Sequence, residues 1–108
     1  MTGVQTCALP ISRDRIVLDP GVGFGKTPDE NLALVAGAGR LAELGYPVLV
    51  GSSRKGFIGR LTGIKEPRLR DPASVWLAVE AARQGASILR VHDVAGTRQA
   101  LAVWAAMR

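Results

Sequence analysis

Three short apolar runs in this 108-residue chain each end in polar residues that could bind a ligand. They read Arg15-Ile-Val-Leu-Asp-Pro-Gly, Pro47-Val-Leu-Val-Gly-Ser-Ser-Arg-Lys and Ile88-Leu-Arg-Val-His-Asp-Val. Buried parallel strands are apolar and β-branched, and their carboxyl ends meet at one edge of a sheet, where short loops and helix N-termini converge. The three polar sets therefore point to a single site.

The first polar set is a glycine-rich loop, Asp19-Pro-Gly-Val-Gly-Phe-Gly-Lys-Thr. It matches neither the Gly-x-x-x-x-Gly-Lys phosphate loop nor the Gly-x-Gly-x-x-Gly dinucleotide pattern. What remains is a backbone that can approach a ligand closely, with the carboxylate of Asp19 at the strand end. The alternative interpretation of Asp19 is a turn-forming residue before proline.

The second and third sets favour anions. Gly51-Ser-Ser-Arg-Lys places hydroxyls where a short helix over residues 54–61 is predicted to begin. Free N–H groups at such a start favour a bound anion, and Ser53 as a plain N-cap is compatible with this. Arg90 and His92 stand two apart on the third run, so they share one strand face. A cationic pair there indicates a phosphate or pyrophosphate site.

The distribution of charge agrees with a local anion site. The formal net charge is +5, and residues 54–70 alone hold six Lys and Arg against one Glu. The rest of the chain is neutral overall, so the basic excess lies in one strand-to-helix connection. This favours local anion binding over a nucleic-acid-binding face. A solvated basic loop is the alternative for most of these residues.

Helix signals separate the three runs. Thr27-Pro-Asp-Glu is an N-cap sequence whose helix ends before Gly45, Asp71-Pro72 opens a helix that Gly85 closes, and a third helix is predicted from Thr97. The fold class is therefore α/β. Each strand-helix unit takes about 31 residues, as in a (β/α)₈ barrel of ~250 residues, and three units cannot close a barrel. A free-standing doubly wound three-strand layer is the competing architecture.

Residues 1–12 are predicted to be foreign to the protein. Met1 to Ile11 resembles a translated sequencing-library adapter, and it lacks the basic start and long apolar core of a signal peptide. The only cysteine, Cys7, lies in it, so the natural chain is expected to have no disulfide, thiol nucleophile or Cys-based metal site. Residues 13–108 are short for a large domain and start almost at once on a buried-type strand, so they are expected to be a piece of a longer protein. No targeting or membrane-spanning run is found, so the cytoplasm is the expected location.

The three segments together resemble the dihydropteroate synthase family of the folate pathway. Residues 19–26, 51–55 and 90–94 look like the three signature segments of that family's carboxyl half, in order, within a resemblance over residues 12–108. The resemblance implies the last three strand-helix units of a (β/α)₈ TIM barrel. It also implies the reaction: p-aminobenzoate displaces pyrophosphate from 6-hydroxymethyl-7,8-dihydropterin pyrophosphate, with Mg²⁺, giving 7,8-dihydropteroate.

The resemblance carries substrate-binding roles onto matching positions. Asp19 would bind the amino-pyrimidine edge of the pterin, and Lys55 its other polar edge. Phe24, Ser53 and Arg54 would shape the p-aminobenzoate pocket, with the helix start near Ser53 receiving the carboxylate. These residues suit their ligands, because a carboxylate matches a guanidine-like ring edge and a helix start matches a carboxylate.

The leaving group and the remaining expectations follow from the same resemblance. Arg90 and His92 would bind the leaving pyrophosphate, forming the catalytic set with Lys55, and Gly51 completes the substrate-binding residues. None is expected to bind metal, because the family's metal-binding Asn belongs to an amino-terminal half outside these 108 residues. The partners expected are small molecules and, through the last helices, a second copy of the chain, with no nucleic acid or membrane. These 108 residues alone are expected to be inactive.

Two other interpretations of the sequence stay open. Another pterin-binding barrel, such as a methyltetrahydrofolate methyltransferase, would share the Asp but should lack the Ser-Arg-Lys and Arg-Val-His combination. A non-enzymatic basic fragment that binds phosphate or RNA would rest on an isoelectric point near 10.4. A steep salt dependence of RNA binding would distinguish it from an enzyme.

Overall fold

A computed structural model describes residues 11–108 of the chain, which form an α/β arrangement. Strand β1 (Leu49–Val50) pairs in parallel with β2 (Ile88–Leu89), with Leu49 opposite Ile88. On its other side the same segment forms a parallel bridge through Val48 to Leu18. The three apolar runs therefore lie side by side in parallel as predicted, although the regular strands are only two residues long.

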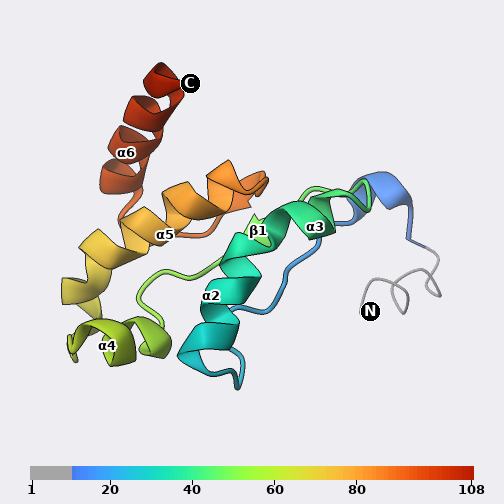
Figure 1. Ribbon diagram of the computed structural model, residues 1–108. Helices are drawn as coiled ribbons and strands as arrows, with labels where there is room; N and C mark the ends of the chain where they lie inside the picture. Colours follow the sequence, from blue (N-terminus) through green and yellow to red (C-terminus); the bar gives the residue numbers. More distant parts are fainter. Residues whose placement is uncertain (1–10) are drawn as a thin grey trace.

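Helices occupy most of the described chain (Figure 1). In chain order they are η1 (Arg13–Arg15), α2 (Pro28–Ala36), α3 (Ala38–Ala42), α4 (Gly56–Thr62), η2 (Pro67–Arg70), α5 (Asp71–Arg83) and α6 (Val94–Met107). None of the described helices is long and apolar enough to cross a membrane. The predicted foreign stretch, residues 1–12, falls almost wholly outside the described residues, as does Cys7, so that prediction stays open.

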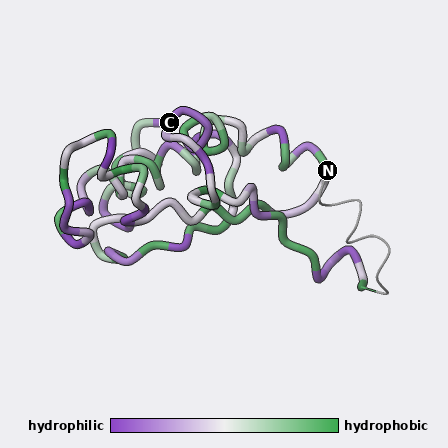
Figure 2. Tube along the Cα trace, turned by 90° about the horizontal axis from the view of Figure 1, so that it is seen from below, coloured by the Kyte–Doolittle hydropathy of each residue, from purple (hydrophilic) through white to green (hydrophobic). Residues whose placement is uncertain are grey.

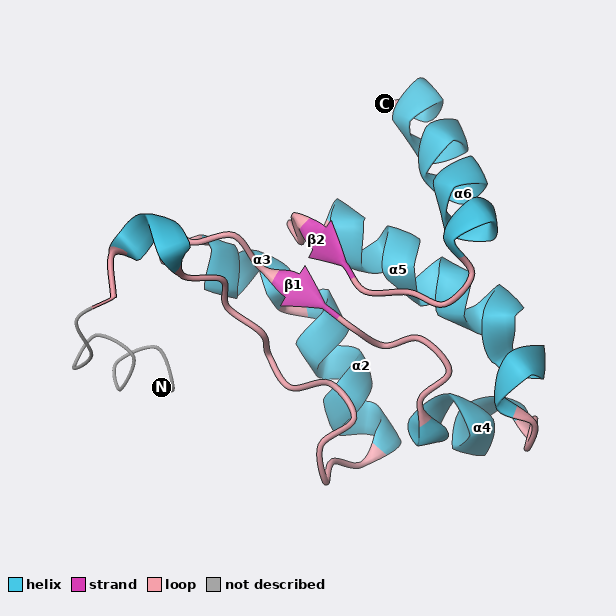
Figure 3. Cartoon of the chain, turned by 180° about the vertical axis from the view of Figure 1, so that it is seen from behind, coloured by secondary structure: helices cyan, strands magenta, loops and turns pink. Residues whose placement is uncertain are grey.

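The core lies between the strands and one layer of helices, as Figure 3 shows with the strands in front of α2, α3 and α5. Alternate strand residues point into this layer, where they meet helix residues; the buried set includes Leu18, Val48, Val50, Val35, Phe57, Ile58, Leu77 and Ala81. The opposite strand face is open among the described residues, because Val17 is 46% exposed and Ile88 40%. Among the described residues, helices therefore cover one face of the sheet.

The first predicted helix starts as expected and is interrupted in the middle. Thr27 forms a capping box, in which its hydroxyl accepts from the Glu30 N–H while the Glu30 carboxylate accepts from the Thr27 N–H. The helix then breaks at Gly37 into α2 and α3. Glycine weakens a helix interior, and at Gly39 the backbone lies so close to α5 that a Cβ would be 2.5 Å from the Gln84 carbonyl oxygen.

Two other helix starts differ from the prediction. The short helix α4 begins at Gly56 and not at residue 54, because Arg54 has a left-handed φ of 59° that no α-helix can contain. Helix α6 begins at Val94, three residues before Thr97, because Asp93 supplies the cap: its carboxylate accepts from the Gly96 N–H at 2.9 Å.

The described part of the chain is flat, with extents of 42 × 35 × 19 Å, and Figure 2 shows it edge-on. Hydrophobic and hydrophilic stretches alternate along the tube in that view. Helix α6 projects from the rest of the described chain and packs against α5 (Figures 1 and 3). At the carboxyl ends of the strands Asp19, Arg90 and His92 are exposed, whereas Ser52 and Ser53 after β1 are buried.

Candidate functional site

Three contacts join the three polar segments in a closed set. The Lys55 Nζ donates to the Val22 carbonyl at 2.9 Å, which links the second segment to the glycine-rich loop. The Ser53 Oγ lies 2.8 Å from His92 Nδ1, which links the second segment to the third. Arg90 Nη1 stands 4.0 Å from Asp19 Oδ2, which links the third segment to the first. The three strand ends therefore lie together as predicted, and their sharing of one ligand site stays a prediction.

Asp19 forms the turn of the alternative interpretation and keeps an acceptor oxygen for the other, which stays a prediction. One carboxylate oxygen accepts the Gly21 N–H at 2.8 Å, as in a turn-forming Asx residue. The other faces Arg90, and the side chain keeps 39% of its surface exposed. An ionised carboxylate has about four acceptor positions, so the turn leaves Asp19 able to receive donors from a ligand.

The glycine-rich loop is anchored by a residue that sequence reasoning missed. Asn31, only 1% exposed, accepts the Gly23 N–H at 2.7 Å through Oδ1. Its Nδ2 donates to the Thr27 carbonyl at 3.0 Å and the Lys26 carbonyl at 3.3 Å. The available signal was a polar residue on the apolar stripe of the helix that follows the loop, since a buried amide must find partners.

The Lys55 side chain lies across the glycine-rich loop, close to the backbone of Gly23. Its Nζ is 4.8 Å from the centre of the Phe24 ring, within range of a cation–π interaction. At Gly23, where φ is 92°, a Cβ would be 2.5 Å from Lys55 Cδ. Glycine is therefore required there both by the conformation and by the space that Lys55 fills. Phe24 is 67% exposed beside it.

The Arg54 turn, residues 51–55, is held by the start of α5. The Arg54 guanidinium makes two hydrogen bonds to Asp71, Nε to Oδ1 at 2.8 Å and Nη2 to Oδ2 at 3.0 Å. These bonds lower the pKa of the Asp71 carboxyl from its usual range and raise the pKa of the Arg54 guanidinium. The Arg54 N–H donates to the Ser74 Oγ at 2.9 Å.

Two of the six basic residues in 54–70, Arg54 and Arg70, make their contacts inside the structure, and anion binding by this segment stays a prediction. Arg54 is paired with Asp71. Arg70 donates to four backbone carbonyls, those of Arg54 at 3.0 Å, Lys55 at 3.5 Å, Ile64 at 2.8 Å and Lys65 at 2.7 Å. Arg70 thus stabilises the loop after α4 through backbone hydrogen bonds. Neither local anion binding nor a solvated basic loop, the two interpretations of the basic residues, predicted this role.

Ser53 supports His92 and does not start a helix. The residue before α4 is Lys55, without a side-chain cap, so the predicted helix start near Ser53 is wrong. The Ser53 Oγ also accepts the His92 backbone N–H at 3.2 Å and is 8% exposed. The hydroxyl can accept from that N–H while donating to Nδ1, which leaves Nε2 to carry the ring proton.

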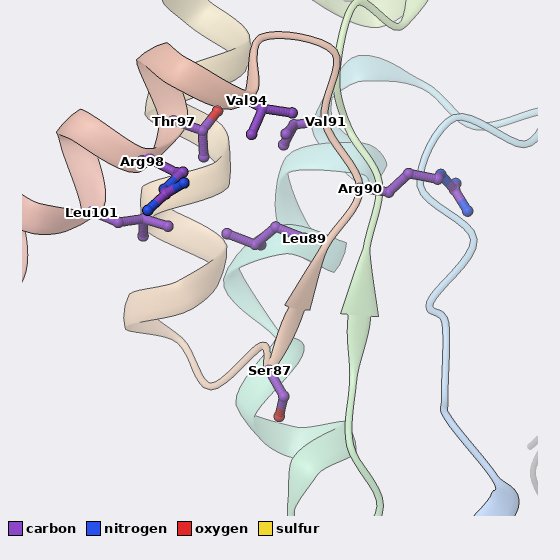
Figure 4. A pocket seen from close by; sticks show the side chains of 8 residues that line it. All are labelled: Ser87, Leu89, Arg90, Val91, Val94, Thr97, Arg98 and Leu101. Carbon is purple, nitrogen blue, oxygen red and sulfur yellow. The ribbon is translucent and has the colours of Figure 1, made fainter.

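Arg90 points to the site, and its neighbours on the strand point elsewhere. Figure 4 shows Leu89 and Val91 facing a cavity of about 460 Å³ beside α6, whereas Arg90 extends past β1 toward the first segment. A Cβ at Gly51 would overlap the Arg90 guanidinium, so this glycine makes room for it. The predicted alternation of faces is met, and a side chain at position 51 would displace the Arg90 guanidinium.

The donor set of the described residues does not fit a metal site. Within residues 11–108 no group of three or more His, Cys, Asp or Glu side chains is placed to hold a metal ion. Mg²⁺ prefers near-octahedral oxygen ligation, which these residues do not assemble.

Comparison with known proteins gives consistent matches. The family model described as pterin binding enzyme matches residues 4–92. A dihydropteroate synthase of Neisseria meningitidis serogroup C is 48% identical over 104 residues, covering 95% of this chain and 37% of the relative. The Xanthomonas albilineans dihydropteroate synthase is similar in two solved complexes. With 4-aminobenzoic acid it gives 53% identity and a TM-score of 0.83, over 86% of this chain and 34% of that one.

The second complex, with 7,8-dihydropteroate, gives 47% identity and a TM-score of 0.88, over 98% of this chain and 40% of that one. The chain thus spans a little over a third of the length of the relatives it matches. Since the family match covers most of the sequence, this chain belongs to the pterin-binding enzyme family.

Proposed function

We propose that the complete protein carrying this chain is a dihydropteroate synthase. It would condense 6-hydroxymethyl-7,8-dihydropterin pyrophosphate with p-aminobenzoate to 7,8-dihydropteroate and pyrophosphate. The observation that carries the proposal is the closed set of contacts between the three loops, which gathers a carboxylate, an ammonium group and a guanidinium-imidazole pair. The similar proteins named above carry that activity in their names, and the Xanthomonas albilineans enzyme is solved in complexes with 4-aminobenzoic acid and with 7,8-dihydropteroate.

The chain would form three consecutive units of a (β/α)₈ barrel, the last three. The open sheet face with Val17 and Ile88 supports this. Barrel strands turn one face to the helices and the other to an interior that is filled by side chains from all the strands. A doubly wound layer would need helices on both faces. Among the described residues helices cover one.

The pterin would bind between Asp19 and Lys55. A carboxylate can accept two hydrogen bonds from adjacent N–H groups of an amino-pyrimidine edge, which is the strong bidentate arrangement. The Lys55 Nζ already donates to a backbone carbonyl, and an ammonium group has three donors, so it can donate to the ring's acceptors as well. The glycine-rich loop would let the backbone approach the ring.

Pyrophosphate would leave from Arg90 and His92. Negative charge on the leaving group grows as the bond to the pterin methylene breaks, so cationic and N–H donors placed there stabilise the transition state more than the ground state. Arg90 offers a guanidinium fork, and His92 offers the Nε2 proton left by its contact with Ser53. Lys55, Arg90 and His92 are thus the proposed catalytic residues.

The p-aminobenzoate pocket would be shaped by Phe24, Ser53 and Arg54, beside Gly51. The exposed Phe24 ring supplies an apolar face for an aromatic substrate. The family implies Mg²⁺, whose ligands we place outside residues 11–108.

A homodimer would form through the last helices. Between α5 and α6 lies an apolar cavity of about 530 Å³, flanked by Trp76, which is 64% exposed, and Trp104. Sedimentation of the complete protein would test this.

The test needs a complete barrel, because residues 11–108 by themselves leave a strand edge and a sheet face uncovered, and the 108-residue chain is expected to be inactive. We suggest a full-length chimera, in which residues 11–108 replace the matched stretch of the Xanthomonas albilineans enzyme. Asp19→Asn in this chimera should weaken binding of the pterin pyrophosphate by roughly 2 to 4 kcal/mol. The asparagine NH2 group would face an N–H group of the amino-pyrimidine edge, and two donors cannot form a hydrogen bond.

Calorimetry would measure that loss. The matched control is Asp29→Asn, which removes an exposed carboxylate on α2 outside the site and should leave affinity unchanged. Unchanged pterin pyrophosphate affinity in Asp19→Asn would show that Asp19 serves only the turn.

A further inference from the structure

Arg54 adopts a backbone conformation that its side chain does not favour. Its φ of 59° makes it the only non-glycine residue of residues 11–108 in the left-handed region. A residue with a Cβ is crowded there by its own carbonyl, so surrounding contacts must hold it. In this chain the holding contacts come from residues 70–74, around the start of α5.

This short segment contacts the backbone and the side chain of Arg54. Asp71 accepts two hydrogen bonds from the guanidinium, at 2.8 and 3.0 Å. Ser74, 4% exposed, accepts the Arg54 N–H at 2.9 Å and donates to the Arg70 carbonyl at 2.8 Å. Arg70 donates to the Arg54 carbonyl at 3.0 Å. Arg70, Asp71 and Ser74, which we name the α5 clamp, therefore hold the N–H, the carbonyl and the side chain of Arg54.

The residues on either side of Arg54 reach into the site. Ser53 contacts His92, and Lys55 contacts the glycine-rich loop. Their peptide bonds are shared with Arg54, so a change in its conformation would move both of them. The clamp is thus placed to set the positions of Ser53 and Lys55 through the backbone of Arg54.

We propose that Asp71 is a positioning residue for the p-aminobenzoate pocket, acting through Arg54. The inference rests on the proposed function, since it concerns the same pocket. Asp71 holds the guanidinium plane in one orientation and neutralises its charge, so that Arg54 forms a fixed wall and not a mobile cation. The side chains are 25% and 24% exposed, so the pair is more sheltered than a surface ion pair.

The direct test is Asp71→Asn in the full-length chimera. An amide of the same shape accepts at one oxygen only, so the Arg54 fork loses its second partner. The KM for p-aminobenzoate should rise about tenfold, the scale of a charged hydrogen bond, while the KM for the pterin pyrophosphate changes less than about twofold. Glu80→Gln is the matched control, because it removes the ion pair with Arg83 on the same helix, away from the site.

A double-mutant cycle separates positioning from general stability. In an Arg54→Ala background, Asp71→Asn should no longer affect the KM for p-aminobenzoate, because the residue through which it acts is gone. Asp71→Glu, which keeps the charge and lengthens the side chain, should fall between the parent and Asp71→Asn. If Asp71→Asn does not fold, Asp71→Glu is compared with the parent in both backgrounds, and the same loss of effect without Arg54 is expected.

An unchanged KM for p-aminobenzoate in Asp71→Asn would overturn the inference. Equal rises for both substrates, or the same rise without Arg54, would also overturn it. A folded chimera that makes no dihydropteroate would instead contradict the proposed function. Turnover by the chimera combined with an unaffected Asp71→Asn would contradict the positioning role alone.

Discussion

The glycine-rich loop and the Arg54 turn bring residues to the same site by opposite means. The loop uses backbone freedom: Gly21, Gly23 and Gly25 all have positive φ values, and the anchoring Asn31 comes from the next helix. The Arg54 turn places a residue with a side chain in the left-handed region, and its anchors come from 16 to 20 residues later in the chain. One part is built locally, and the other depends on tertiary packing.

The difference predicts how each part should respond to substitution. The stability of the glycine-rich loop should depend on its glycines and on Asn31. Substitutions there should change the loop and leave the Arg54 turn intact. The Arg54 turn is held by the α5 clamp, so a substitution within the turn should lower the stability less where the clamp contacts remain. In the full-length chimera we therefore expect the largest losses of unfolding free energy in the loop and smaller ones in the turn.

Asn31→Ala should have the largest effect on stability. It removes three hydrogen bonds at a buried position, and at about 1 kcal/mol for each bond the loss is roughly 3 kcal/mol. Thr27→Ala is the comparison, since the exposed capping box of the same helix should cost only about 1 kcal/mol. Denaturant unfolding measures both, and an Asn31 effect no larger than that of Thr27 would contradict the anchoring role.

Gly23→Ala should come next, and Gly25→Ala is its matched control. Both glycines have positive φ, so an alanine at either costs about 1 kcal/mol in strain. At Gly25 a Cβ meets no atom within 4 Å, whereas at Gly23 it collides with Lys55. Gly23→Ala should therefore cost about 2 kcal/mol and weaken pterin binding, and Gly25→Ala should spare the binding. Equal binding losses would show that Lys55 is not held by this approach.

Residue 54 offers a test of strain in the other part. Arg54→Gly and Arg54→Ala both lose the pair with Asp71, but only alanine keeps a Cβ in the left-handed region. The glycine variant should be the more stable by about 1 kcal/mol in denaturant unfolding. If the alanine variant is as stable as the glycine variant, the turn relaxes once the Arg54 side chain is removed. The left-handed φ of residue 54 then costs less than about 1 kcal/mol.

The smallest effect is a pH dependence at Asp71. The Arg54 hydrogen bonds, with a smaller contribution from the charge of His92, lower the pKa of this carboxyl below its unfolded value. The stability from the pair is therefore fully present above about pH 5 and decreases as the pH falls through the lowered pKa. Thermal unfolding of the parent and of Asp71→Asn should converge in acid. A stability difference that persists at about pH 2 would contradict this origin.

The sequence predicted the features that depend on near neighbours. The capping box at Thr27, the Asx turn of Asp19 and the parallel order of the three runs all follow from local patterns. The start of α4 could not be predicted in this way, because Arg54 is held out of the helix by Ser74 and Asp71. The cost of a left-handed arginine is visible only once its distant partners are known.

The roles of charged residues show the same limit. A count of basic residues could not separate Arg70, which donates to backbone carbonyls, from Arg90, which reaches the site. A guanidinium serves as a staple or as a ligand group depending on what surrounds it, and the sequence contains no signal for the register between α5 and the turn. Strand position did identify Arg90, because alternation places it opposite Leu89.

The measurement that tests the central claim most directly compares two ligands on one variant. If Arg90 holds the pyrophosphate, Arg90→Ala in the chimera should weaken binding of the pterin pyrophosphate at least about tenfold and leave binding of the free dihydropterin alcohol unchanged. Arg98→Ala, which removes a guanidinium beside the cavity next to α6, should affect neither ligand. Equal losses for ester and alcohol in Arg90→Ala would mean that Arg90 holds the barrel together, and the assignment of the pyrophosphate site would be wrong.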